Sequence, residues 1–216
     1  MPAAATSRSV AVCPRWTQQV LGDSSAGTRC RWPPRGAPSC GVVVVLRTVE
    51  PTELRYADGP STESSITIAA SPAAVWTLVT DIETPARFSE EFQGGSWLDG
   101  ATGAALGARF EGRNRHEAAG EWTTTSTVVE LDHERRFGWA VGDPAAPSAL
   151  WRFTLEPEGA GTCLTQWMRM GPARSGINPA IDAMPDKESR ILHRRLAEHR
   201  ANMERTLEGI RALAEP

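Results

Sequence analysis

The sequence predicts an α+β protein in which one long C-terminal helix covers an antiparallel sheet. Between residues 63 and 170, short segments of alternating apolar and polar residues follow one another, separated by turn residues. Two short helical segments interrupt them after the first strand, and residues 187–213 repeat apolar residues at helical spacing. The order strand, two short helices, six strands and helix is typical of the α+β class. An antiparallel sheet with one charged face needs cover only on its apolar face, and we expect the last helix to supply it.

Length and composition predict one globular domain with no membrane span. The chain has 216 residues, of which 40% are hydrophobic and 23% charged, as in ordinary globular proteins. No apolar run approaches the roughly 20 residues that a transmembrane helix needs. Residues 1–48 carry a net charge of +5, which leaves −8 for the remainder. Because phosphate binding needs clustered basic residues, the acidic remainder predicts that nucleic acid is not the partner.

Residues 1–61 are expected to lie outside the folded domain. They mix Ser, Gly, Pro, Ala and Arg without sustained periodicity, and Pro33-Pro34 breaks any regular element. They contain no apolar core of a signal peptide. We interpret them as a disordered extension or as the product of a start codon assigned too far upstream; an arginine-rich transit peptide is the alternative. The cysteine spacing is not that of a zinc site, and we expect a reduced, cytoplasmic protein. Lys187 is the single lysine, which indicates GC-rich codon use, as in actinobacteria.

The first predicted strand, residues 63–69, is followed by helix signals. Ser71 is an expected N-cap with Pro72 at the first helical position, so a helix should cover residues 72–80. A second short helix is predicted over residues 84–90. The pair Glu90-Glu91 at its end is interpreted as solvated, because adjacent helical residues point in different directions.

Six further strands are predicted, over residues 93–98, 108–116, 121–131, 136–141, 149–155 and 162–170. Alternation places aromatic and apolar side chains on one face of these strands and mostly charged ones on the other. In the last helix, the apolar row contains one polar residue, His199, and Arg195 falls on the side expected to be solvated.

Several local segments resemble the START-like (SRPBCC) superfamily, in its polyketide cyclase/dehydrase and lipid transport branch. They are SPAAVW at 71–76, WLDG at 97–100, GARFEGRNR at 107–115, WTTTSTV at 122–128 and RFGW at 136–139. The resemblance covers residues 62–213, which we take as the domain. It implies the Bet v 1-like helix-grip fold, a curved seven-stranded antiparallel sheet around a long C-terminal helix, with a cavity between them. Because the superfamily uses this cavity for unrelated tasks, the resemblance implies the fold more directly than the function.

A mainly apolar cavity with a few polar groups suits a small molecule. We therefore expect binding of a small hydrophobic ligand such as a lipid, a polyketide or an aromatic metabolite, without a cofactor; no oligomeric state is predicted. The predicted ligand-binding residues are those on the inward faces, although aromatic and methionine side chains also form ordinary cores. They are Phe110, Asn114, Trp139, Trp151, Phe153, Leu164, Gln166, Met168, Met170, Leu196 and Met203.

Two histidines are candidates for acid/base chemistry. His199, on the apolar face of the helix, and His116, at a strand end, could move protons if the protein is a polyketide cyclase or dehydrase. The alternative is that His199 is a core residue with one buried partner and that His116 is solvated. No residues have the spacing of a metal site. A third hypothesis is a cochaperone-like interaction module, which predicts a filled core and an exposed apolar patch.

Overall fold

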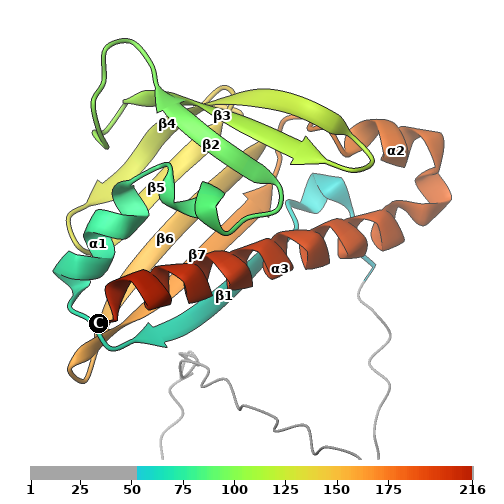
Figure 1. Ribbon diagram of the computed structural model, residues 1–216. Helices are drawn as coiled ribbons and strands as arrows, with labels where there is room; N and C mark the ends of the chain where they lie inside the picture. The colour runs from blue at the N-terminus through green and yellow to red at the C-terminus, as the bar shows by residue number, and fades with distance from the viewer. Residues whose placement is uncertain (1–52, 216) are drawn as a thin grey trace, which may run out of the picture. The chain divides into compact units, whose positions relative to one another are not determined.

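The computed structural model describes residues 53–215, which form one sheet, three α-helices and three short 3₁₀ helices (Figure 1). In chain order the elements are η1 (Tyr56–Asp58), β1 (Ser61–Ile68), α1 (Pro72–Thr80), η2 (Thr84–Arg87), β2 (Phe92–Trp97), β3 (Arg109–His116), β4 (Gly120–Asp132), β5 (Arg136–Val141), β6 (Ala149–Glu158), β7 (Gly161–Met170), α2 (Asn178–Ala183), η3 (Pro185–Lys187) and α3 (Glu188–Ala214).

The seven strands form one antiparallel sheet in the order β1-β7-β6-β5-β4-β3-β2. Strands β2 to β7 therefore make a continuous meander, and β1 pairs with the last of them. The 27-residue helix α3 lies along the sheet, with α1 and η2 near its C-terminal half (Figure 1). This is the predicted α+β arrangement, the Bet v 1-like helix-grip fold.

Helix α1 begins as the sequence predicts. The Ser71 hydroxyl accepts a hydrogen bond from the Ala74 N–H at 3.3 Å, and Pro72 occupies the first helical position, where no N–H is needed. The second predicted helix, 84–90, is shorter in the structure and ends at Arg87. The helix ends early because the Ser89 hydroxyl accepts hydrogen bonds from the N–H groups of Glu91 and Phe92, at 3.1 and 2.9 Å. These bonds turn the chain into β2.

The core contains two clusters, which α3 joins. One lies between the sheet, α1 and the C-terminal half of α3, and it includes Phe137, Leu164 and Ile210, each at most 1% exposed. The other lies at the opposite half of α3 and includes Met168, Met170 and Leu192. The predicted helical stripe is buried at Leu192, His199, Met203, Leu207 and Ile210, whereas Leu196 is half-buried.

The packed part of the chain extends N-terminal of residue 62. Tyr56 is 8% exposed and its hydroxyl donates to the Ala173 carbonyl at 2.7 Å, while its N–H donates to Glu188 Oε1 at 2.8 Å. Residues 53–61 are thus tied to the fold, and the rest of the predicted extension, 1–52, lies outside the described residues. Within residues 53–215 no helix is long and apolar enough to cross a membrane.

Candidate functional site

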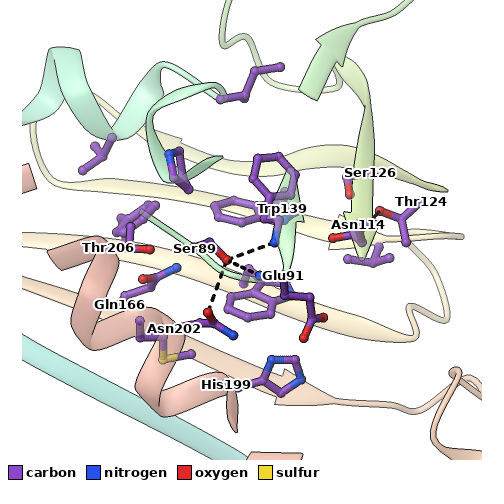
Figure 2. A pocket seen from close by; sticks show the side chains of 18 of the residues that line it. Ser89, Glu91, Asn114, Thr124, Ser126, Trp139, Gln166, His199, Asn202 and Thr206 are labelled. Carbon is purple, nitrogen blue, oxygen red and sulfur yellow. Dashed lines mark hydrogen bonds between the residues drawn. The ribbon is translucent and has the colours of Figure 1, made fainter. Parts of the chain in front are cut away.

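A cavity opens between the inner face of the sheet and α3 (Figure 2). About 130 Å³ of it is open to the centres of water-sized molecules, against the roughly 10–15 Å³ that one buried water requires. The core is therefore not completely filled. The lining residues are Val79, Ile82, Pro85, Ser89, Glu91, Phe92, Phe110, Asn114, Thr124, Ser126, Phe137, Trp139, Val141, Trp151, Phe153, Gln166, His199, Asn202, Met203 and Thr206.

Aromatic side chains of neighbouring strands form the sheet side of the cavity. Trp139 of β5 and Trp151 of β6 are register partners, and their rings stack with centroids 6.2 Å apart and planes 5° apart. Phe110 of β3 meets Trp139 edge to face at 6.1 Å. Because side chains that oppose one another across a sheet share a face, strand alternation brings these rings together. They form an apolar aromatic wall, and aromatic groups pack favourably against such rings.

His199 faces this wall from α3. The residue is 8% exposed, and its ring stands perpendicular to Trp151, with centroids 5.4 Å apart. Burial, followed by the positive charges of Arg195 and His116, lowers the pKa of His199 well below 6.5. Its ring nitrogens form no hydrogen bond within residues 53–215. The site thus contains a neutral imidazole that is available to a ligand.

Gln166, at the middle of β7, also projects into the cavity. It is 5% exposed, and its Oε1 is buried without a hydrogen-bond partner among the described residues. Such an atom costs roughly 1–3 kcal/mol when it is left unpaired. Gln166 is therefore a place where a bound molecule or a water would gain a hydrogen bond.

The segment before β2 is held against α3 by polar contacts. Asn202 Oδ1 accepts hydrogen bonds from the Glu90 N–H at 3.0 Å and from Arg205 Nη2 at 2.8 Å. Figure 2 shows Ser89, Glu91 and Asn202 around one part of the cavity, where the Ser89 and Asn202 side chains meet. These contacts place a polar rim beside the aromatic wall.

Glu91 and Arg195 form a two-pronged ion pair at this rim. Arg195 Nη1 donates to Glu91 Oε2 at 2.7 Å and Nη2 donates to Oε1 at 2.6 Å, with side chains 16% and 13% exposed. Burial by itself would lower the pKa of Arg195, but hydrogen bonds and charges from Glu91 and then Glu198 outweigh it and raise the pKa. The prediction that Glu91 ends a solvated helix and that Arg195 lies on the solvated face is wrong. The two residues are 104 positions apart, so only the tertiary fold brings them together.

His116 lies outside the cavity lining, at the end of β3. Its Nδ1 accepts the Ala118 N–H at 3.2 Å, and its Nε2 lies 3.5 Å from Glu198 Oε2. Burial alone would raise the pKa of Glu198, but hydrogen bonds from Arg194 and Arg195, with the charges of Arg195 and His116, lower it. His116 therefore belongs to a charged network beside α3.

The structure brings most of the predicted site residues together around this cavity. Those in the lining are Phe110, Asn114, Trp139, Trp151, Phe153, Gln166, His199 and Met203. Those outside it are Leu164, Met168, Met170, Leu196 and His116. Leu164, Met168 and Met170 do face inward on β7, but the two core clusters fill the space in front of them. Only the middle of the strand, at Gln166, faces open space.

Several polar lining residues were missed from the sequence. Asn202 and Thr206 follow His199 by three and seven positions, so helical periodicity could have found them. Ser89 and Glu91 carry no comparable signal, because the tertiary fold places their loop. In the described part of the chain, no group of three or more His, Cys, Asp or Glu could hold a metal ion.

Comparisons with known proteins agree with the fold described above. A family described as "Polyketide cyclase / dehydrase and lipid transport" matches residues 60–215. The solution NMR structure of a Polyketide_cyc-like protein from Corynebacterium glutamicum is 33% identical, with 71% of this chain and 90% of that chain covered and a TM-score of 0.50. None of the curated proteins compared with the sequence matches it.

Two more distant structures share the fold alone. The di-domain ARO/CYC BexL from the BE-7585A biosynthetic pathway is 18% identical, with 73% of this chain and 50% of that chain covered and a TM-score of 0.54. Major latex-like protein 151 from Panax ginseng is 10% identical, with 73% and 98% covered and a TM-score of 0.50.

Proposed function

Because the chain belongs to the polyketide cyclase/dehydrase and lipid transport family, we propose that its cavity binds a small hydrophobic molecule. Among lipids, polyketides and aromatic metabolites, the stacked Trp139 and Trp151 favour an aromatic ligand. The observation that carries the proposal is an open aromatic-walled cavity lined by Gln166, whose buried Oε1 has no hydrogen-bond partner among residues 53–215. Apolar walls with a few directed polar groups are the usual form of a small-molecule site.

Native mass spectrometry of the protein purified from its own host tests the proposal. Ser126 is 2% exposed and lines the cavity, so the larger side chain in Ser126→Phe should occupy the space of the ligand. Thr127 is the next residue of β4 and points to the other face of the sheet, so Thr127→Phe is the matched control. A bound small molecule should accompany the wild type and the control and be lost from Ser126→Phe. No bound molecule in the wild type, or equal occupancy in both variants, would contradict the proposal.

A second candidate function is a cyclase or dehydrase reaction, which His199 favours. A neutral, buried imidazole without a hydrogen-bond partner could take a proton from the carbon beside a ketone. The amide N–H group of Gln166 in the same lining could hold the carbonyl oxygen. The other amide in the lining, Asn114, is already committed, because its Nδ2 donates to Gly112 O at 3.2 Å and to Thr124 Oγ1 at 3.4 Å. His116, outside the lining, does not share this position.

The fate of a bound ketide separates carriage from catalysis. If the protein is an enzyme, His199→Asn should abolish conversion and keep binding, whereas exposed His193→Asn should change neither. A ligand that is returned chemically unchanged by the wild type would favour carriage. The third hypothesis, an interaction module, predicts a filled core, and the open cavity does not favour it.

A further inference from the structure

Three polar side chains gather on the sheet and helix around Gln166, and none has a hydrogen-bond partner within residues 53–215. Gln166 Oε1 is buried and unpaired, and so is the Oγ of Ser64, which is 7% exposed. Thr206 of α3 is 2% exposed, lines the cavity, and its hydroxyl forms no hydrogen bond in the described part of the chain. Buried polar groups are normally paired, so this concentration needs an explanation.

Strand register places two of the three side by side. Ser64 of β1 is the direct partner of Gln166 of β7, so both side chains point to the same face of the sheet. On the other side of Gln166, its partner in β6 is Phe153, which is fully buried and offers no polar atom. Gln166 comes from β7 and Thr206 from α3, and both line the cavity (Figure 2). We call Gln166 and Thr206, which both line the cavity, the Gln166 subsite; Ser64 lies next to Gln166 in the sheet and outside the lining.

We infer that the Gln166 subsite recognises a hydroxyl group on an uncharged aromatic ligand, which makes the ligand a phenol or a related aromatic alcohol. This inference rests on the proposed function. A hydroxyl both donates and accepts hydrogen bonds, so it can donate to Gln166 Oε1 and accept from the hydroxyl of Thr206, the other polar residue of this group in the cavity lining. A ketone oxygen can only accept, from the Gln166 N–H or the Thr206 hydroxyl, and would leave Oε1 unpaired. A purely apolar group would leave both side chains of the subsite unpaired.

The rest of the lining favours a neutral ligand. Among the described residues that line the cavity, Glu91 is the only one with a carboxylate, and the ion pair with Arg195 already neutralises it. The Arg195 guanidinium, which could otherwise pair with an anionic ligand, is thus already paired with Glu91. An ionised group in such a cavity would lose its hydration without gaining a counter-charge.

Calorimetric titration with 2-naphthol and 2-methylnaphthalene tests the inference, because these probes have similar size and differ in one hydroxyl. The wild type should bind 2-naphthol roughly ten- to a hundredfold more tightly. In Gln166→Met, which keeps the length of the side chain, the preference should fall to within about threefold. Thr127→Val, on the outer face of β4, should keep the wild-type preference.

Each outcome has a distinct meaning. Equal binding of both probes by the wild type overturns the inference and leaves the proposed function standing. Binding of neither probe overturns the proposed function and the inference with it.

Thermal unfolding without ligand supplies a second measurement. If Gln166 is unpaired in the free protein, Gln166→Met should leave the Tm unchanged or raise it, because an unsatisfied polar group is removed. A clear fall in Tm would mean that Gln166 is hydrogen-bonded within the fold, which would overturn the inference.

Discussion

Replacing Glu91 with Gln should destabilise the protein much more than the same change at its neighbour Glu90. Both carboxylates lie just before β2 and both pair with arginines of α3. Glu91 binds Arg195 through two hydrogen bonds of 2.6 and 2.7 Å. Glu90 binds Arg205 through one contact of 3.0 Å. The two pairs therefore join the same segments and differ in burial and in the number of hydrogen bonds.

Burial sets the expected magnitudes. The Glu91 and Arg195 side chains are 13% and 16% exposed, whereas those of Glu90 and Arg205 are 77% and 40% exposed. Removing one partner of a buried pair costs roughly 3–5 kcal/mol, and exposed pairs contribute about 0–1 kcal/mol. Because the Glu91 pair retains some solvent contact, Glu91→Gln should cost about 2–4 kcal/mol. For a domain of this size that corresponds to a fall in Tm of roughly 4–16 °C.

Urea unfolding of a double-mutant cycle measures the interaction directly. The cycle combines Glu91→Gln with Arg195→Met, which keeps most of the alkyl chain, and the control cycle combines Glu90→Gln with Arg205→Met. We expect a coupling free energy of about 2 kcal/mol in the first cycle and less than about 1 kcal/mol in the second. Equal coupling in the two cycles would refute the reasoning, since burial would then not set the strength of the pair.

Three further predictions concern stability. The pKa of His199 is lowered on folding, so below pH 6.5 the unfolded chain binds a proton that the folded protein does not. As the pH is lowered, the unfolding free energy should therefore fall by up to about 1.4 kcal/mol per pH unit. His199→Asn should flatten this pH dependence in urea titrations. Gly209→Ala, which in most helices stabilises by about 1 kcal/mol, should instead lower the Tm, because the added methyl group overlaps the Phe88 ring; an unchanged or higher Tm would contradict this packing. Tyr56→Ala should lower the free energy of unfolding by about 3–5 kcal/mol and Tyr56→Phe by about 1 kcal/mol, as measured by chemical unfolding. A negligible change in both variants would show that residues before 62 do not support the fold.

Most of the fold could be predicted because each strand carries its own pattern. Phe137 and Trp139, or Trp151 and Phe153, occupy every second position, and a half-buried strand needs that spacing. The start of α1 was equally local, since Ser71 and Pro72 act within the first helical turn. The helix predicted over 84–90 was too long, because the hydroxyl of Ser89 binds the backbone that follows it.

The candidate site could be predicted only in part. Alternation indicated that Leu164, Gln166 and Met168 face inward on β7, but it could not indicate which of them meets empty space. Similarly, helical periodicity placed His199 on the apolar face correctly, but the prediction that Arg195 is exposed to solvent was wrong. A charged residue at the border of an apolar stripe is buried or exposed according to what packs against it.

The sequence by itself determined the antiparallel strands, the terminal helix and the inward direction of Gln166 and His199, because these follow from local periodicity. Only the tertiary structure decided where the cavity lies, that Glu91 and Arg195 close its rim, and that Ser64 stands beside Gln166. Each of these depends on residues about 100 positions apart in the chain. Their proximity comes from strand register and from the path of α3 across the sheet, neither of which a local pattern contains.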